Sequence, residues 1–414
     1  MAISGTLNLP GDKSISHRAL MLASLANGRS ELRNLSTADD VVSTISCLKS
    51  CGLKYDRTSN GVIINGGNFV DPDQPLDCGN SGTTMRLLLG LLSGQGINAT
   101  LIGDESLSKR PMKRIINPLK QMGLKIISKD YKSPIKIQKS KLNGISYNSP
   151  IASAQIKSSL LFSGLGAAGT TMITEPILSR NHSEIMLNNL GAKIKTNDLS
   201  ISITKSNNFS PLNLTIPSDT STASFFIAAA ILISDSRIKF NRLLLNPTRT
   251  GFLNAIKKMG CTIKFIDTSI ENGEKIGNVE VYHQKLKGIT IDKSDVPSII
   301  DELPILALMA TQAHGITKVY GAEELRVKES DRIAAICDNL KNMGADVEEL
   351  EDGFIIKGPT KLNGALIKTY DDHRIAMTFE IAALIAEGKT QLDNNSCISI
   401  SFPEFYSTLE SILQ

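Results

Sequence analysis

The chain has 414 residues, enough for two or three domains that each bury their own core. Apolar residues make up 41% and charged residues 21%, which excludes a disordered chain, a coiled coil and a collagen-like fibre. The 45 Lys and Arg residues exceed the 41 Asp and Glu residues by only four, so we expect neither nucleic acid nor a membrane surface as a partner.

The chain start lacks the charged segment and apolar run of a signal peptide, and the longest apolar stretch, near Ala223–Ile233, is too short to span a bilayer. The six cysteines form no CxxC pair and have no nearby CxxH. These features predict a cytoplasmic protein with mostly buried thiols, without a disulfide framework or a zinc site.

A helix-like segment that ends in glycine recurs along the chain, at Gly52, Gly123, Gly191, Gly260 and Gly344. Glycine is the usual helix stop because it adopts the left-handed conformation at little cost. Two alternating segments separated by a turn follow each glycine, which predicts hairpins such as Leu53–Asn65 around Asn60-Gly61 and Ala345–Lys357 around Asp352-Gly353.

A second helix, richer in Ala, Leu and Gly, precedes each of these segments and should be buried. We expect these inner helices at Ser16–Ala26, Thr83–Ser93, Ala154–Gly164, Ala223–Ile233, Leu303–Thr311 and Arg374–Ala386. Short strands should follow at Ser30–Leu35, Ala99–Gly103, Thr170–Glu175, Arg237–Leu243, Thr317–Tyr320 and Lys389–Leu392, and the last outer helix at Tyr406–Leu413. The pattern predicts six copies of an α/β unit of about 69 residues, with a scaffold without chemistry as the alternative.

Cations gather where these helices begin, although a helix N-terminus attracts anions and repels Lys and Arg. They are Lys13, Arg18, Arg110, Arg180, Lys328, Arg332 and Arg374, with Lys157 and Arg249 at two further helix starts. Placing the first seven of these cations there costs stability unless an anion is bound. As a recurring set, these residues predict a site for a ligand with more than one phosphate or carboxylate.

Two carboxylates, Asp301 and Glu329, indicate which chemistry the site could perform. Glu329 lies between Lys328 and Arg332, and by itself indicates an ion pair, but with Asp301 it supplies the two groups that proton transfer requires. His373 fits an acid–base residue and a polar helix start equally well. No nucleophile with a matched base and no metal-ligand spacing is visible. The residues thus predict an acid–base enzyme that acts on a polyanionic small molecule.

The segment Gly11-Asp12-Lys13-Ser14 imitates a P-loop, but Asp12 stands where that motif needs glycine, so we do not expect an NTPase.

Six motifs, in order from residue 9 to residue 377, resemble those of the EPSP synthase family (3-phosphoshikimate 1-carboxyvinyltransferase). They are Leu-Pro-Gly-Asp-Lys13-Ser14-Ile-Ser-His-Arg18, Gly79-Asn-Ser-Gly-Thr83-Thr-Met-Arg86, Lys-Arg110-Pro-Met, Ser153-Ala-Gln155-Ile-Lys157, Leu-Arg-Val-Lys328-Glu329-Ser-Asp-Arg332 and Asp372-His373-Arg374-Ile-Ala-Met. The residues of these motifs are more similar to those of the bacterial class II branch than to those of class I.

The resemblance implies an enolpyruvyl-transferase fold with two domains of three βαβαββ units each, at 12–217 and at 218–414 plus 1–11, and an active site in the cleft between them. It implies transfer of the enolpyruvyl group of phosphoenolpyruvate to the 5-hydroxyl of shikimate 3-phosphate through a tetrahedral ketal. It further implies a monomer and no metal or organic cofactor.

The resemblance also implies the site residues. Shikimate 3-phosphate should lie mainly against the first domain. It should be bound by Lys13, Ser14, Arg18, Ser153, Ala154, Gln155, Arg180, Asp301 and Lys328. Phosphoenolpyruvate should be surrounded by Lys13, Asn80, Gly82, Thr83, Arg110, Gln155, Arg332, His373 and Arg374. Asp301, Glu329 and Lys13 should be catalytic.

The chain departs from class I at two positions. Ala154 stands where class I has a second serine, and Ile400 stands where class I has a lysine near the phosphoenolpyruvate site. Gly82 leaves room beside that site, so the slightly longer compound glyphosate is a possible inhibitor.

Three rival interpretations remain. UDP-N-acetylglucosamine enolpyruvyl transferase shares the fold but usually has a cysteine in the region of Leu101–Arg114, where this chain has none. A non-catalytic binding protein would be expected to lack Asp301, Glu329 or Lys13. An RNA-end-processing enzyme would need a nucleotide site and a more basic surface.

Overall fold

The computed structural model describes residues 2–59 and 61–414, so Met1 and Asn60, which we predicted in the first hairpin turn, lie outside the described residues. The chain forms two compact units. We call Gly11–Ile216 with Glu271–Glu274 the first unit, and the second unit comprises the residues up to Pro10, Pro217–Ile270 and Lys275–Gln414. Among the described residues, no helix has both the length and the apolarity needed to cross a membrane.

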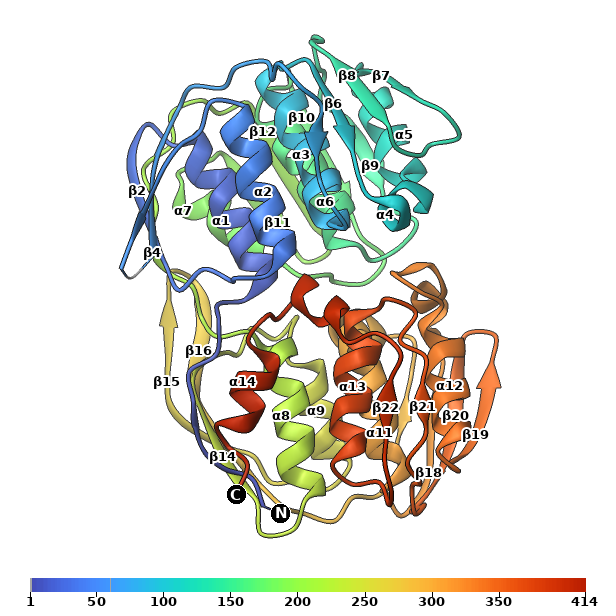
Figure 1. Cartoon of the computed structure of the whole chain (residues 1–414). Coiled ribbons are helices and arrows are strands. Elements are labelled where there is room, and N and C mark those ends of the chain that lie inside the picture. Colours follow the sequence, from blue (N-terminus) through green and yellow to red (C-terminus); the bar gives the residue numbers. More distant parts are fainter. Residues whose placement is uncertain (1, 60) are drawn as a thin grey trace. The chain divides into compact units, whose positions relative to one another are not determined.

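Each unit contains three inner helices that pack against one another (Figure 1). These helices are apolar around most of their circumference and are therefore buried, as the sequence predicted; in α8 only Thr222 and Leu232 are partly exposed. They are α1 (Lys13–Leu25), α3 (Gly82–Gln95), α6 (Ala154–Gly164), α8 (Thr220–Leu232), α11 (Leu303–Thr311) and α13 (His373–Ala383).

The outer helices are α2 (Asp39–Ser50), α5 (Lys113–Gln121), α7 (His182–Asn189), α9 (Gly251–Lys258), α12 (Arg332–Asn342) and α14 (Phe405–Glu410). The five recurring glycines end the first five of these helices with φ between 82° and 100°, which confirms their predicted role as helix stops. Short helical segments also occur at α4 (Glu105–Lys109), α10 (Val296–Ile299), η1 (Ile300–Glu302), η2 (Glu323–Val327) and η3 (Ser396–Ile400).

Five repeats each build a four-stranded sheet with a parallel edge strand, a central strand and a hairpin. In the first unit the sheets are β13 (Asn213–Thr215), β2 (Gly28–Arg33), β4 (Gly61–Gly66), β3 (Lys54–Thr58); β5 (Leu76–Asp77), β6 (Ala99–Ile102), β8 (Ile135–Gln138), β7 (Lys125–Ser128); and β9 (Ser146–Asn148), β10 (Thr170–Thr174), β12 (Ser200–Thr204), β11 (Ile194–Asn197). In the second unit they are β1 (Ser4–Leu7), β14 (Arg237–Leu244), β16 (Glu274–Tyr282), β15 (Lys264–Glu271); and β17 (Thr290–Ile291), β18 (Gly315–Val319), β20 (Gly353–Gly358), β19 (Asp346–Leu350).

The sixth repeat is shorter than the others. Its sheet has two strands, β21 (Leu366–Ile367) and β22 (Gln391–Leu392), and after α14 the chain pairs Leu413 with Ile3. The sixth unit therefore has the helices and parallel strands of the predicted repeat but, among the described residues, no hairpin.

Two strands are exchanged between repeats. Strand β1 comes directly before α1 but pairs with β14 of the fourth repeat, with Ser4 opposite Arg237. Strand β13 comes directly before α8 but pairs with β2 of the first repeat, with Asn213 opposite Glu31. The chain consequently passes from one unit to the other after Pro10 and again after Ile216.

Two glycines bring α3 and α6 into backbone contact. A Cβ atom on Gly90 would lie 2.1 Å from the carbonyl oxygen of Ser159, and one on Gly94 would lie 2.4 Å from that of Phe162. Only glycine permits this approach. The N-termini of the two helices, which carry Thr83 and Gln155, therefore lie side by side, with Gln155 Nε2 donating to Thr83 Oγ1 at 3.0 Å.

Candidate active site

In the first unit, Arg18 joins three of the inner and outer helices. It is 2% exposed, donates to the carbonyl oxygen of Ser14 at 3.0 Å, and approaches that of Ala154 at 3.5 Å. Arg180, from the segment before α7, donates to Ser14 Oγ at 3.2 Å. Ser153 is the N-cap of α6 and lies next to Ala154. The structure thus brings together residues that the sequence assigned to shikimate 3-phosphate.

The residues assigned to phosphoenolpyruvate in this unit also converge. Arg110 donates to Asn80 Oδ1 at 2.7 Å, although the two lie 30 residues apart. A Cβ atom on Gly82 would lie 3.3 Å from Arg110 Nη1 and 2.9 Å from Arg86 Nη1. The start of α3 is therefore lined by two guanidinium groups and by the helix's own N–H groups, an arrangement that favours anions.

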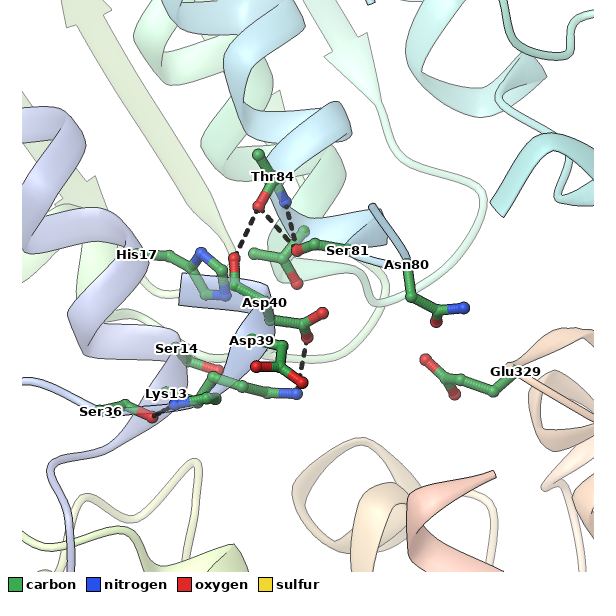
Figure 2. Close-up of polar contacts among 12 residues, drawn as sticks. Lys13, Ser14, His17, Ser36, Asp39, Asp40, Asn80, Ser81, Thr84 and Glu329 are labelled. Carbon is green, nitrogen blue, oxygen red and sulfur yellow. Dashed lines mark hydrogen bonds and ion pairs between the residues drawn. The ribbon is translucent and has the colours of Figure 1, made fainter. Parts of the chain in front are cut away.

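Lys13, the first residue of α1, forms an ion pair with Asp40 on α2, with 2.8 Å between Nζ and Oδ2 (Figure 2). The two side chains are 20% and 11% exposed, so the pair is only partly screened by water. Asp40 thus holds the ammonium group that the sequence assigned to both substrates.

A chain of buried hydroxyl groups connects α1, α2 and α3. His17 Nδ1 lies 2.7 Å from Thr44 Oγ1, which lies 2.6 Å from Thr84 Oγ1. Thr84 Oγ1 in turn donates to Oγ of the N-cap Ser81 at 2.7 Å (Figure 2). We call His17, Thr44, Thr84 and Ser81 the hydroxyl chain. It fixes the start of α3, beside Asn80 and Gly82, relative to the helix that carries Lys13.

Burial, together with Lys13 and Arg18, holds the pKa of His17 well below its ordinary value, although Asp12 acts in the opposite direction. The imidazole is therefore neutral. Its Nε2 is buried and has no hydrogen-bond partner among the described residues. Because an unpaired buried N–H is costly, we infer that the proton is on Nδ1 and is donated to Thr44.

In the second unit, the two carboxylates with predicted catalytic roles share one cation. Arg332 Nη2 lies 2.6 Å from Glu329 Oε2, and its Nη1 lies 3.8 Å from Asp301 Oδ1. Lys328 Nζ is 3.5 Å from the same Asp301 oxygen. The structure therefore brings Asp301, Lys328, Glu329 and Arg332 into one cluster.

Asp372 organises this cluster. It is fully buried at the N-cap of α13 and accepts hydrogen bonds from Arg332 Nε at 2.8 Å and Nη2 at 3.1 Å. Burial opposes the charge of Arg332, but Asp372, Glu329 and Asp301 outweigh burial and raise the pKa of the guanidinium. Arg332 is thus a fixed cation.

His373 and Arg374 form the first turn of α13, and both are buried. Arg374 lies over the ring of Phe225, 5.8 Å from its centroid. Its Nη1 is buried without a hydrogen-bond partner among the described residues. A buried guanidinium with an unused donor fits the anion-binding role that the sequence assigned to Arg374.

Two cations at predicted helix starts are held by carboxylates of their own unit. Arg249 lies 3.4 Å from Asp219 and 3.7 Å from Glu302, and Lys157 is fully buried between Glu175 and Glu184. At these two helix starts the chain supplies the negative charge itself.

Sequence reasoning missed Asp40, Arg86, Thr44 and Asp372. Each acts through a partner at least 27 residues away, such as Arg86 on Gln155 at 2.8 Å. Asp372 did have a local signal, since it precedes an inner helix as an N-cap.

Ile400 ends η3 and is partly exposed, two residues before Phe402, which packs edge-on against Phe226.

The comparisons with known proteins agree with this arrangement. The family model described as EPSP synthase (3-phosphoshikimate 1-carboxyvinyltransferase) matches residues 1–409. The chain is 46% identical to the 3-phosphoshikimate 1-carboxyvinyltransferase of Thermodesulfovibrio yellowstonii, over 99% of this chain and 97% of that protein. It is 44% identical to the protein of that name from Koribacter versatilis, over 100% and 97% of the two chains.

Solved structures give the same result. The EPSP synthase of Acinetobacter baumannii is 38% identical and superposes with a TM-score of 0.88, covering 99% of this chain and 96% of that chain. The enolpyruvyl transferase NikO of Streptomyces tendae, 16% identical, shares the fold with a TM-score of 0.79 over 99% and 95% of the chains.

The fold and the two clusters define an enolpyruvyl transferase. The chain belongs to the EPSP synthase family. Its reaction transfers the enolpyruvyl group of phosphoenolpyruvate to the 5-hydroxyl of shikimate 3-phosphate and releases phosphate, in the shikimate pathway to the aromatic amino acids.

Proposed function

We propose that Asp301 and Glu329 of the second unit supply the acid–base groups, with Lys13 beside Glu329, and that cations of both units bind the anionic groups of the substrates. Both clusters act on the same pair of substrates. The observation that carries this proposal is the shared guanidinium of Arg332, which holds Asp301 and Glu329 beside one positive charge.

In this mechanism Asp301 takes the proton from the 5-hydroxyl while that oxygen bonds to C2 of phosphoenolpyruvate. Glu329, with Lys13, gives a proton to the methylene carbon, which yields the tetrahedral ketal. The bond from C2 to the phosphate oxygen then breaks, and the proton leaves the methyl carbon to Glu329. Cations beside each carboxylate stabilise the charges that appear along this path.

The substrates divide among the binding residues by their chemistry. Arg18 and Arg180 present guanidinium groups around Ser14, suited to a phosphate ester, so we assign them with Ser153, Ala154, Gln155 and Lys328 to shikimate 3-phosphate. Arg110, with Asn80, Gly82 and Thr83, is assigned to phosphoenolpyruvate, together with Arg332, His373 and Arg374.

We further propose the bacterial class II branch for this chain. The support is Ala154, whose carbonyl oxygen approaches Arg18 where class I has a serine hydroxyl nearby. A cytoplasmic location is proposed on the basis of the six buried free thiols. A monomeric state is proposed from the family resemblance alone. Glyphosate is proposed as an inhibitor that competes with phosphoenolpyruvate beside Gly82.

The test is phosphate release by the purified protein with phosphoenolpyruvate and shikimate 3-phosphate, run beside UDP-N-acetylglucosamine as acceptor and with a chelator present. Release with shikimate 3-phosphate alone supports the proposal. Release with the nucleotide sugar, or loss of activity in chelator, contradicts it.

A further inference from the structure

Lys157 ends the motif Ser153-Ala-Gln155-Ile-Lys157, but it has no assigned role toward either substrate. It lies in the first turn of α6, two residues after Gln155, yet its side chain is 0% exposed. Its Nζ lies 2.7 Å from Glu175 Oε2 and 2.7 Å from Glu184 Oε1. An ammonium group enclosed by two carboxylates is not placed to bind a substrate directly.

The first of these carboxylates closes a loop. Glu175 follows β10 and accepts hydrogen bonds from Ser179 Oγ at 2.5 Å and Ser179 N at 3.4 Å. Lys157 Nζ also donates to the carbonyl oxygen of Ser179 at 3.4 Å. Both ends of the loop 175–179 are thus tied to Lys157, and the next residue is Arg180.

The second carboxylate leads to Arg18. Glu184 lies on α7 next to Ser183, whose Oγ accepts from Arg18 Nε at 2.8 Å. Ser158, the residue after Lys157, accepts from Arg18 Nη2 at 2.9 Å and lies 2.6 Å from Ser183 Oγ. Both arginines of the proposed phosphate site therefore depend on segments that Lys157 joins.

We propose that Lys157 is a positioning residue for recognition of the phosphate of shikimate 3-phosphate. It holds the segment 175–184 against α6, so that Arg180 and Arg18 meet around Ser14. The inference rests on the proposed assignment of these two arginines. It predicts that damage to this buried cluster weakens binding of one substrate, and of its phosphate in particular.

Charge supports this role over simple packing. The cluster contains two carboxylates for one ammonium group, and such a buried arrangement persists only when geometry and further hydrogen bonds compensate it. Here the hydrogen bonds that compensate Glu175 come from the loop that ends at Arg180. Positioning the loop and compensating the buried charge of Glu175 are therefore one requirement.

The experiment compares Lys157→Met, Ser179→Ala, Arg180→Ala and the exposed-site control Lys195→Met, on β11 of the same unit. Calorimetry measures the Kd of shikimate 3-phosphate, and kinetics measures the KM of phosphoenolpyruvate and kcat/KM with shikimate as the unphosphorylated acceptor. Lys157→Met should raise the Kd of shikimate 3-phosphate by ~10²-fold, because misplaced binding groups lose contributions of that order. Its preference for shikimate 3-phosphate over shikimate should narrow by a similar factor.

If Lys157→Met fails to fold, the triple variant Lys157→Met, Glu175→Gln and Glu184→Gln removes all three charges, and the same rise in the Kd of shikimate 3-phosphate is expected for it. Ser179→Ala should raise this Kd by a smaller factor, about 3- to 10-fold. Lys195→Met should behave like the native chain. An unchanged Kd in folded Lys157 and Ser179 variants, while Arg180→Ala binds poorly, overturns the positioning role alone. Equal losses for shikimate and shikimate 3-phosphate also overturn it. No effect of Arg180→Ala overturns the site assignment and the inference with it.

Discussion

Lys13 Nζ lies 2.8 Å from Oδ2 of Asp40, and this ion pair joins the first turns of α1 and α2 (Figure 2). Replacement Asp40→Asn keeps the shape of the side chain but removes its charge. We expect kcat/KM for phosphoenolpyruvate to fall about tenfold, because Lys13 loses the charged partner that orients it. Steady-state kinetics checks this, with Asp56→Asn on the exposed strand β3 as the matched charge change. Equal activity of the two variants would contradict the proposed role of the pair.

Replacing the carboxylates around Arg332 should lower turnover without a comparable loss of substrate binding. Asp301→Asn and Glu329→Gln should each lower kcat by ~10²-fold or more, as loss of a general acid or base does. Calorimetry should find shikimate 3-phosphate binding changed less than threefold in Glu329→Gln. Glu323→Gln, at an exposed ion pair of the same unit, is the control. A parallel loss of binding and turnover would instead indicate a positional role.

The hydroxyl chain should be sensitive to Thr44. Thr44→Val preserves volume but leaves His17 and Thr84 without their shared partner, at a cost of about 1–3 kcal/mol in the free energy of unfolding. Because Ser81 caps α3, we also expect a higher KM for phosphoenolpyruvate. Thr44→Ser retains the hydroxyl and should restore both values. Thermal unfolding and steady-state kinetics of Thr44→Val and Thr44→Ser test this prediction. Equal losses of stability and equal increases of KM in the two variants would show that packing alone matters.

His17 should make stability depend on pH. In the unfolded chain the imidazole binds a proton below its ordinary pKa of 6.5, whereas burial, Lys13 and Arg18 lower the pKa in the folded state. The unfolded state then binds more protons, so the contribution is complete above pH 6.5 and is lost as the pH falls. Between pH 7.5 and 5.5 the native chain should lose ~1.4 kcal/mol more unfolding free energy than His17→Asn. Urea titrations at both pH values measure this difference. An equal change of the unfolding free energy with pH in the native chain and in His17→Asn would contradict the prediction.

Gly82→Ala should act on the inhibitor more than on the substrate. Its Cβ would lie 2.9 Å from Arg86 Nη1 and 3.3 Å from Arg110 Nη1, so two flexible side chains must shift. We expect the KM of phosphoenolpyruvate to rise several-fold and the inhibition constant of glyphosate to rise by at least ~10-fold more, because a longer ligand has less room to adjust. Equal changes in both constants would refute the steric explanation.

The inner helices show what the sequence could predict. Leu303–Thr311 and Ala154–Gly164 have the predicted bounds, and the other inner helices differ by one to three residues at an end, because apolar periodicity defines the ends of a helix less sharply than its middle. The glycine stops were predictable because a positive φ selects glycine at that position. Local rules thus define the repeat.

Long-range pairing was not predictable in the same way. Nothing near Lys157 in the chain identifies Glu175 and Glu184 as its partners, and nothing near Asp372 identifies Arg332, 40 residues earlier. Such pairs depend on how helices from different repeats pack. The exchange of β1 and β13 is equally invisible locally, because each strand has the same pattern whichever sheet it joins.

That exchange also determines how the gene could be rearranged. The two ends of the chain meet in one unit, where Gln414 N donates to the carbonyl oxygen of Ala2 at 3.0 Å. A circular permutant that begins at Pro217, runs through the old ends and finishes at Ile216 would make the discontinuous unit continuous, apart from the four residues Glu271–Glu274. If these four residues are left out of the count, its units would be joined by one covalent connection where the natural chain has two. Proteolysis at that single connection would then yield two complementary polypeptides, each carrying all the strands of its own sheets except the tip of one hairpin.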